Sequence, residues 1–102
     1  MKRLILAVAL MAAAPVAVQA AAKPYTGQEL AKSAHVTLEQ ARAIALKARP
    51  GKVTDKELEK EAGGSGLRWS FDIKSPGKSF EVGVDARTGK VLENKVEGPH
   101  PD

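Results

Sequence analysis

The sequence predicts an α+β fold in which one main helix packs on an antiparallel meander of three or four strands, with a short additional helix on the N-terminal side. Two observations predict it. From residue 67 onward, apolar and polar residues alternate in runs that are separated by glycine-containing turns, as in strands with one buried face. Before them, residues 41–48 repeat alanine and isoleucine at the spacing of one helix face.

Residues 1–20 are predicted to be a secretory signal peptide and not part of the fold. Lys2 and Arg3 precede an apolar core, and Val18-Gln19-Ala20 forms a small-residue cleavage site. Cleavage after residue 20 or after residue 22 fits the pattern. The apolar run is shorter than the roughly 20 residues of a membrane span. We therefore expect a periplasmic or secreted protein with no membrane span after cleavage.

Behind the signal peptide we expect three further segments. Residues 21–35 form an arm with a short helix, residues 36–97 a folded domain, and residues 98–102 a polar, proline-rich flexible tail. The arm's helix is expected from Gly27 to Ser33, because Thr26 and Glu29 fit a capping box.

Composition excludes several classes of protein. The chain has no cysteine, which excludes a disulfide framework and a lipid attached at cysteine. The formal net charge is +4, but Lys2 and Arg3 belong to the signal peptide, and aromatic residues make up only 4% of the chain. Nucleic-acid binding is not expected, because it favours a basic stripe with aromatic residues. So small a domain should be a monomer or a weak dimer.

The main helix has a clear start and end. Thr37 is placed to cap it, with Gln40 three residues later to complete a capping box, and Pro50-Gly51 ends it. Its buried face is predicted to consist of four small or branched residues: Ala41, Ile44, Ala45 and Ala48.

The next segment, residues 52–62, fits two structures. It is rich in helix formers, and Thr54 with Glu57 could cap a helix. As a strand it would pair with the run that follows, with Leu58 opposite Phe71 and Glu61 opposite Arg68. Propensity favours the helix, whereas pairing and the protection of a charged sheet edge favour the strand.

Three strands should complete the sheet. Leu67, Trp69, Phe71 and Ile73 share one face of the first, and residues 78–84 form the second. The run from Asp85 to Gly89 should be a tight turn. Asp85 can accept hydrogen bonds from backbone amides two residues on, and Gly89 can adopt a positive φ. Residues 90–96 then return as the last strand.

These features together resemble the PepSY domain family, and specifically its small free-standing exported members. The matching residues are Leu38–Ala48, Pro50–Val53 and the closing segment Val84–Leu92, so that the resemblance covers residues 36–96. It implies one helix against an antiparallel sheet, and this favours a strand at residues 53–61. PepSY domains occur in propeptides of secreted metallopeptidases and have been proposed to inhibit or regulate peptidases. The resemblance carries over no catalytic or binding residue.

The residues themselves offer little chemistry. The histidines are His35 and His100, and no nucleophile or zinc motif accompanies them, so we expect no enzyme. If residues 52–62 form a strand, the carboxylates of residues 55, 57, 59 and 61 would share one face. Neighbours on that face lie about 7 Å apart, too far to share an ion easily. We therefore predict no metal site and no cofactor.

The resemblance leads to two hypotheses for function. The first is an exported, non-catalytic module that binds an exported peptidase or another envelope protein. Its partner could add a strand beside Val91, Leu92 and Val96, while Asp85 and Gly89 serve the turn. The sequence fits equally well an alternative in which one of those apolar residues packs under the N-terminal helix expected from Gly27 to Ser33. The second hypothesis is a stand-alone periplasmic accessory or sensor that binds a small ligand or a metal ion.

Overall fold

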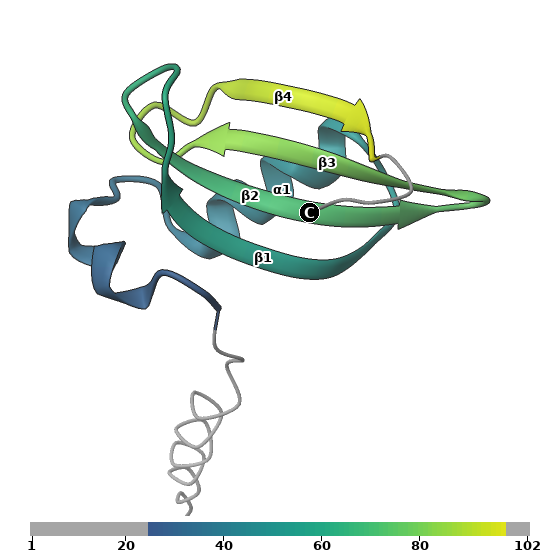
Figure 1. Cartoon of the computed structure of the whole chain (residues 1–102), viewed down its shortest axis with the longest axis horizontal. Coiled ribbons are helices and arrows are strands. Elements are labelled where there is room, and N and C mark those ends of the chain that lie inside the picture. The colour runs from purple at the N-terminus through teal and green to yellow at the C-terminus, as the bar shows by residue number, and fades with distance from the viewer. Residues whose placement is uncertain (1–24, 98–102) are drawn as a thin grey trace, which may run out of the picture.

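The computed structural model describes residues 25–97; the predicted signal peptide and the tail at 98–102 lie outside this range. The fold is α+β, as predicted: one main helix and one short 3-10 helix accompany a four-stranded antiparallel sheet (Figure 1). No helix in the described range is long and apolar enough to cross a membrane. The elements in chain order are η2 (Gln28–Ser33), α1 (Leu38–Ala48), β1 (Lys52–Lys60), β2 (Leu67–Ser75), β3 (Lys78–Asp85) and β4 (Val91–Val96).

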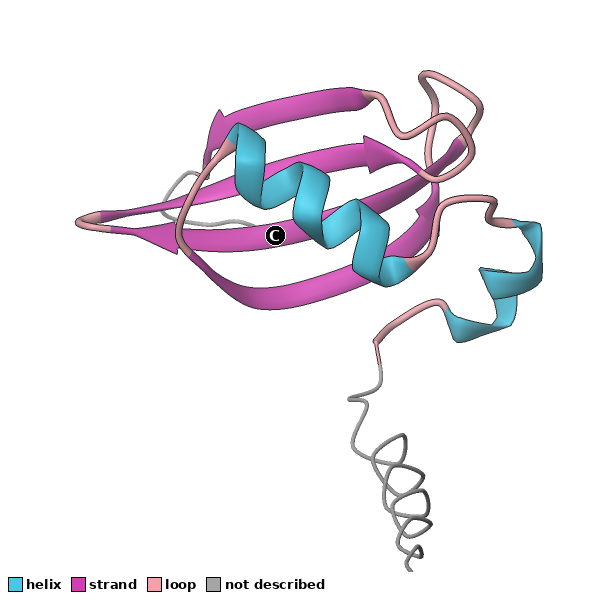
Figure 2. Cartoon of the chain, turned by 180° about the vertical axis from the view of Figure 1, so that it is seen from behind, coloured by secondary structure: helices cyan, strands magenta, loops and turns pink. Residues whose placement is uncertain are grey.

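Helix α1 covers one face of the sheet (Figure 2), and within residues 25–97 no helix covers the opposite, open face, which is turned toward the viewer in Figure 1. Its predicted capping box is present: Thr37 Oγ1 accepts a bond of 3.0 Å from the Gln40 amide, and Gln40 Oε1 accepts one of 2.9 Å from the Thr37 amide. Ala41 and Ala45 are fully buried against the sheet. Their small side chains let the helix backbone approach the strands closely.

The ambiguous segment is strand β1, at one edge of the sheet order β1-β2-β3-β4. Its helix propensity is overridden by tertiary packing, because Leu58 is only 1% exposed within the core. The predicted register is wrong by two residues: Leu58 lies opposite Trp69, and Glu59 opposite Arg68. A shift of two residues keeps each side chain on its predicted face.

The N-terminal arm contacts the outer edge of β1 near the C-terminal end of that strand. Thr26 pairs with Glu57, and its carbonyl accepts a bond of 2.8 Å from the Leu58 amide. The predicted Thr26–Glu29 capping box is wrong, because the N-cap of η2 is Gly27, which has a φ of 95° and makes no side-chain capping bond. Glycine is needed at that position, since a Cβ atom there would collide with the carbonyl of Leu58.

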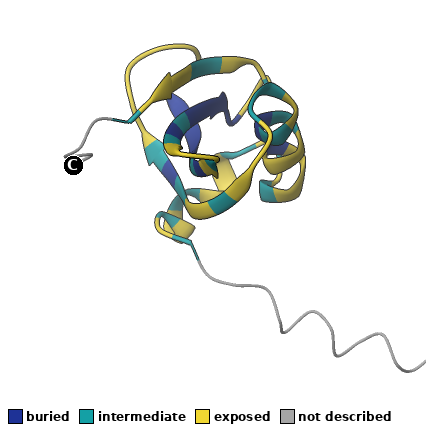
Figure 3. Cartoon of the chain, turned by 90° about the vertical axis from the view of Figure 1, so that its right-hand side faces the viewer, coloured by how far each residue is buried: buried dark blue, intermediate teal, exposed yellow. Residues whose placement is uncertain are grey.

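The core lies between α1 and the sheet, where the buried residues gather (Figure 3). Trp69 is 2% exposed, and its indole Nε1 donates a bond of 2.8 Å to the carbonyl of Val36 just before α1. Tyr25 packs edge-on against the indole, with ring centroids 5.0 Å apart. Trp69 therefore joins the sheet to the arm and to the start of the helix. The largest buried side chains are Trp69, Phe71, Leu58, Ile73, Val82, Val84 and Asp85.

A buried carboxylate, that of Asp85, ties the two hairpin loops together. Asp85 is 1% exposed and accepts bonds from the Ser65 amide (2.6 Å) and hydroxyl (2.7 Å). It also accepts bonds from the amides of Arg87 (2.8 Å) and Thr88 (3.1 Å) in its own turn. Burial alone would raise the pKa of Asp85, but these four bonds outweigh it and hold the pKa well below its usual range.

The same turn also anchors the chain before α1. The carbonyl of Ala86 accepts bonds of 2.9 Å from the amides of His35 and Val36, and the Ala86 amide donates to the carbonyl of Leu67 (2.8 Å). Gly89 closes the turn with a φ of 83° and donates to the Asp85 carbonyl at 2.9 Å. The turn at Asp85 thus holds β2, β3, the β1–β2 loop and the entry to the helix in one place.

Gly64 gives a test of this arrangement, because a Cβ atom there would collide with the Asp85 carboxylate. Gly64→Ala should lower the free energy of unfolding by about 3 kcal/mol, through an unfavourable positive φ and loss of charge-assisted bonds. Gly77→Ala is the matched control: φ is also positive, at 79°, but a Cβ atom has open space. It should cost about 1 kcal/mol. Equal losses in urea unfolding would contradict the role given to Asp85.

Candidate functional site

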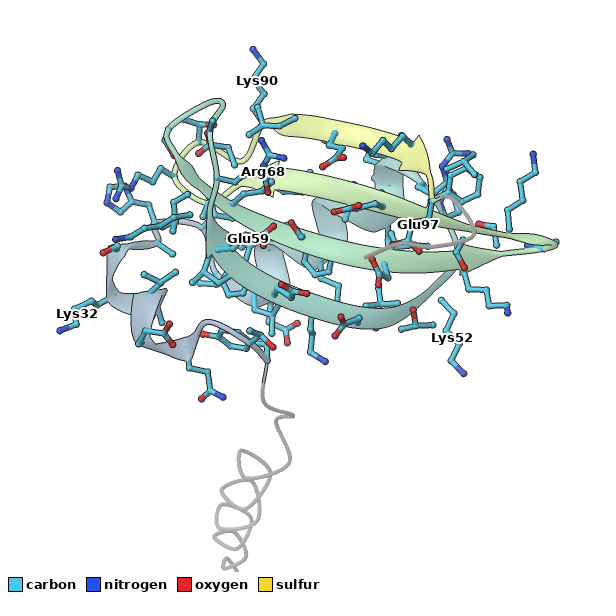
Figure 4. All side chains as sticks on the ribbon, viewed as in Figure 1. Lys32, Lys52, Glu59, Arg68, Lys90 and Glu97 are labelled. Carbon is cyan, nitrogen blue, oxygen red and sulfur yellow. The ribbon has the colours of Figure 1, made fainter. Side chains whose placement is uncertain are left out.

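The face of the sheet opposite α1 carries a hollow of about 530 Å³ that is lined almost entirely by carboxylates. Figure 4 shows Glu59 and Glu97 on this open face, with the helix behind the sheet. The predicted row of acidic residues along β1 is present, and the other strands add carboxylates to it. The lining residues are Asp55, Glu57, Glu59, Glu61, Ser70, Asp72, Glu81 and Glu97.

Carboxylates lie directly opposite one another across three strands of this face. Asp72 of β2 lies opposite Asp55 of β1 on one side and opposite Glu81 of β3 on the other. Like charges at opposed positions are destabilising in a sheet. The fourth strand ends the row with Lys95, opposite Glu81.

The electrostatics of the hollow reflect this crowding. Partial burial, a hydrogen bond with Glu97 and the charges of Glu97 and Asp55 raise the pKa of Asp72 to about 6. Burial also raises the pKa of Glu81, with contributions from the charges of Glu93 and Asp72. A hydrogen bond between the side chains of Glu59 and Glu61 raises the pKa of Glu61.

One arginine compensates part of this charge. Arg68, whose side chain is 9% exposed, contacts the carboxylates of Glu61 (3.4 Å) and Glu93 (3.2 Å), and its Nη2 donates to the Ala62 carbonyl at 3.0 Å. Glu61 thus attracts Arg68 as predicted, but it does so from the β1–β2 loop, because Glu59 occupies the position opposite Arg68 in the ladder. The arginine lies over Gly83, where a Cβ atom would come within 2.8 Å of its Cδ.

The hydroxyl and imidazole groups of residues 25–97 lie apart from one another, and the acidic residues form no metal cluster there. No group of three or more histidine, cysteine or acidic side chains there is arranged to hold a metal ion. Ser65 and Ser70 donate their hydroxyl protons to Asp85 and Glu59. His35 is exposed before α1, and His100 lies beyond the described residues.

The two edges of the sheet differ in what covers them. The N-terminal arm pairs with β1 at Glu57, as described above, and η2 also lies on that side. Within the described chain no strand pairs with the outer edge of β4. β4 therefore presents the free edge.

The three residues predicted to bind a partner have different environments. Val91 is 37% exposed and Val96 is 49% exposed, so both are accessible beside the free edge. Leu92 is half-buried and points toward Gly64 in the β1–β2 loop, where an added Cβ atom would come within 2.8 Å of its Cδ1. The alternative that one of them packs under the N-terminal helix is wrong, because η2 contacts β1 at the opposite edge.

Sequence reasoning did not foresee the hollow itself. The carboxylates of β1 could be predicted to share one face, because they occupy alternate positions in the sequence. Asp72, Glu81 and Glu97 join them only through the pairing of the strands, which the sequence pattern does not reveal. It also missed Ser65 as a partner of the Asp85 carboxylate, because the contact joins two loops 20 residues apart.

Comparison with known proteins agrees with this architecture. Residues 36–95 match the family described as PepSY, peptidase propeptide and YPEB domain. The chain belongs to the PepSY family. The match begins just before the capped helix and ends within β4 of the PepSY domain. No curated protein and no solved structure matches the chain.

Membership in the PepSY family gives a coarse functional class. PepSY is a propeptide and regulatory domain family that is generally non-catalytic, and its members are typically found in exported proteins. The family therefore associates this domain with peptidases.

The open face predicts an unusual pH dependence. In the folded protein the pKa of Asp72 is about 6, above its ordinary value of 3.8. Protonated Asp72 therefore stabilises the fold fully below about pH 4, and this stabilisation is lost as the pH rises through 6. Asp72→Asn should raise the free energy of unfolding at pH 7.5 by up to about 1 kcal/mol, since solvent screens part of the repulsion. Its effect at pH 4 should be smaller.

The control is Glu29→Gln, which removes an exposed carboxylate of η2 outside the hollow. Asp72→Asn should alter the pH profile more than this control does. Urea unfolding between pH 4 and pH 8 measures both variants. A wild-type profile that rises steadily through pH 6, or an Asp72→Asn profile identical to it, would disagree with this picture of the hollow.

Proposed function

We propose that this protein is an exported, non-catalytic binding module that docks on a secreted or periplasmic peptidase and restrains it. The free edge of β4 is the observation that carries the proposal. An extended segment of the peptidase would add a strand there, with main-chain hydrogen bonds supplying affinity. Val91 and Val96 flank the added strand and supply apolar contact.

The hydrogen-bonding pattern between β3 and β4 indicates which backbone groups of β4 are free to bond an added strand. The Glu97 amide donates to the Ser79 carbonyl at 2.9 Å, so residue 97 bonds inward toward β3. Pairs in an antiparallel ladder alternate between bonded and non-bonded. The backbone groups of Asn94 and Val96 therefore point outward, toward the place of an added strand.

Other features of the molecule support a protein partner at this edge. The opposite edge is partly occupied by the N-terminal arm, and β1 carries alternating charges that guard an edge against pairing. The acidic open face repels nucleic-acid phosphates. Within residues 25–97 no group of three or more histidine, cysteine or acidic side chains is arranged to hold the metal ion that the sensor hypothesis allows.

The test uses one position with two substitutions. Val96→Pro removes an outward-pointing amide, which an edge strand tolerates, whereas Val96→Thr keeps the amide and nearly the same volume. The mature chain is titrated into a secreted metallopeptidase whose own PepSY-containing propeptide has been removed. Wild type and Val96→Thr should inhibit it similarly, and Val96→Pro about tenfold more weakly, because one bond is lost.

Melting curves of the three proteins establish that each is folded. Equal inhibition by the folded Val96→Pro variant would place the contact elsewhere on the domain. If even the wild type neither binds nor inhibits the peptidase, the proposal fails and the accessory or sensor hypothesis takes its place.

A further inference from the structure

The free edge carries a pattern of charge that is complementary to itself. On the open face of the sheet, Glu93, Lys95 and Glu97 alternate in sign along the end of β4. We propose that β4 pairs antiparallel with β4 of a second copy of this chain, about a two-fold axis at Asn94, and joins two sheets into one of eight strands. This inference goes beyond the proposed function, because it needs no peptidase.

The backbone allows this pairing. Asn94 and Val96 direct their amides and carbonyls outward, as derived above, so an Asn94-centred pair brings outward groups of both copies into bonding positions. The Asn94 side chain does not obstruct the edge. It is held on the helix side, where Oδ1 accepts from Arg49 Nε at 3.1 Å and Nδ2 donates to the Ala48 carbonyl at 3.4 Å.

Charge selects the register. With the axis at Asn94, Glu93 of each copy lies opposite Lys95 of the other, which gives two attractive cross-strand pairs. Moving the axis by one residue sets Lys95 opposite Lys95, or Glu93 opposite Glu93, and either arrangement is repulsive. An axis at Val96 would oppose Lys95 to Glu97 but would leave the first half of β4 unpaired.

Lys95 can take part without leaving its present partner. Its Nζ lies 3.0 Å from Glu93 Oε2 of the same strand, and its side chain is 66% exposed. In the paired sheet each ammonium would lie between two Glu93 carboxylates. A lysine on an edge strand ordinarily discourages pairing, but the glutamates on either side convert it into an attractive contact here.

The pairing is expected to be weak. It joins about five residues of each copy, so the contact is smaller than the roughly 1,000 Å² of a stable interface. Association should therefore depend on concentration. It would also cover the edge assigned above to the peptidase, and the two kinds of pairing would compete.

Sedimentation equilibrium of the mature chain alone, from micromolar to millimolar concentration, tests the pairing. Wild type should form dimers, and Lys95→Glu should dimerise about tenfold more weakly, because both attractive pairs become repulsive. Lys90→Glu makes the same change in net charge on an exposed side chain just before β4 (Figure 4) and should dimerise like wild type.

Single cysteines report the register, because the natural chain has none. Asn94→Cys should form a disulfide-linked dimer on oxidation in preference to Lys95→Cys. Monomeric behaviour of the wild type at every concentration, equal weakening by Lys95→Glu and Lys90→Glu, or preferential cross-linking of Lys95→Cys would each overturn the inference. Since no peptidase is present, this failure is distinct from failure of the proposed function.

Discussion

The buried carboxylate of Asp85 accepts four hydrogen bonds, and the positions of most other elements follow from it. Two of the bonds hold the β1–β2 loop, and two shape the turn into β4. The next residue, Ala86, binds β2 and the segment before α1 through its backbone. A small domain without disulfides thus fixes its loops with one buried carboxylate whose hydrogen bonds compensate the cost of burying its charge. Burying the same charge without such bonds would strongly destabilise the fold.

The sheet held in this way is asymmetric in both its faces and its edges. One face packs on the small residues of α1, and the other carries a hollow of opposed carboxylates. One edge is partly covered by the N-terminal arm, and the other is free. The carboxylates make the open face sensitive to pH, whereas the free edge offers main-chain bonds to a partner. For this member of the PepSY family we propose the free edge as the place where a polypeptide binds.

Local patterns predicted the parts of this fold that depend on local chemistry. The capping box at Thr37 and the alternation of β2 are of this kind. Strand β1 needed the family resemblance, because its helix-forming composition is overridden by pairing with β2 along its length and by the burial of Leu58. The β1–β2 register and the contact of Asp85 with Ser65 could not be predicted, since both depend on how a glycine-rich loop closes in three dimensions. The acidic row along β1 was predicted, but the hollow was not, because its other carboxylates are brought in by strand pairing.

The central claim is that the ionised Asp85 carboxylate stabilises the fold, and the unfolding free energy of Asp85→Asn measures this most directly. Because the pKa of Asp85 is lowered in the folded state, its stabilisation is present above its ordinary pKa and is lost as the pH falls below it. At pH 7 the substitution should cost about 3 kcal/mol, since the amide cannot accept all four bonds. The cost should shrink as the pH is lowered below about 4. A variant as stable as the wild type at pH 7, or a cost that does not change with acidification, would contradict the account.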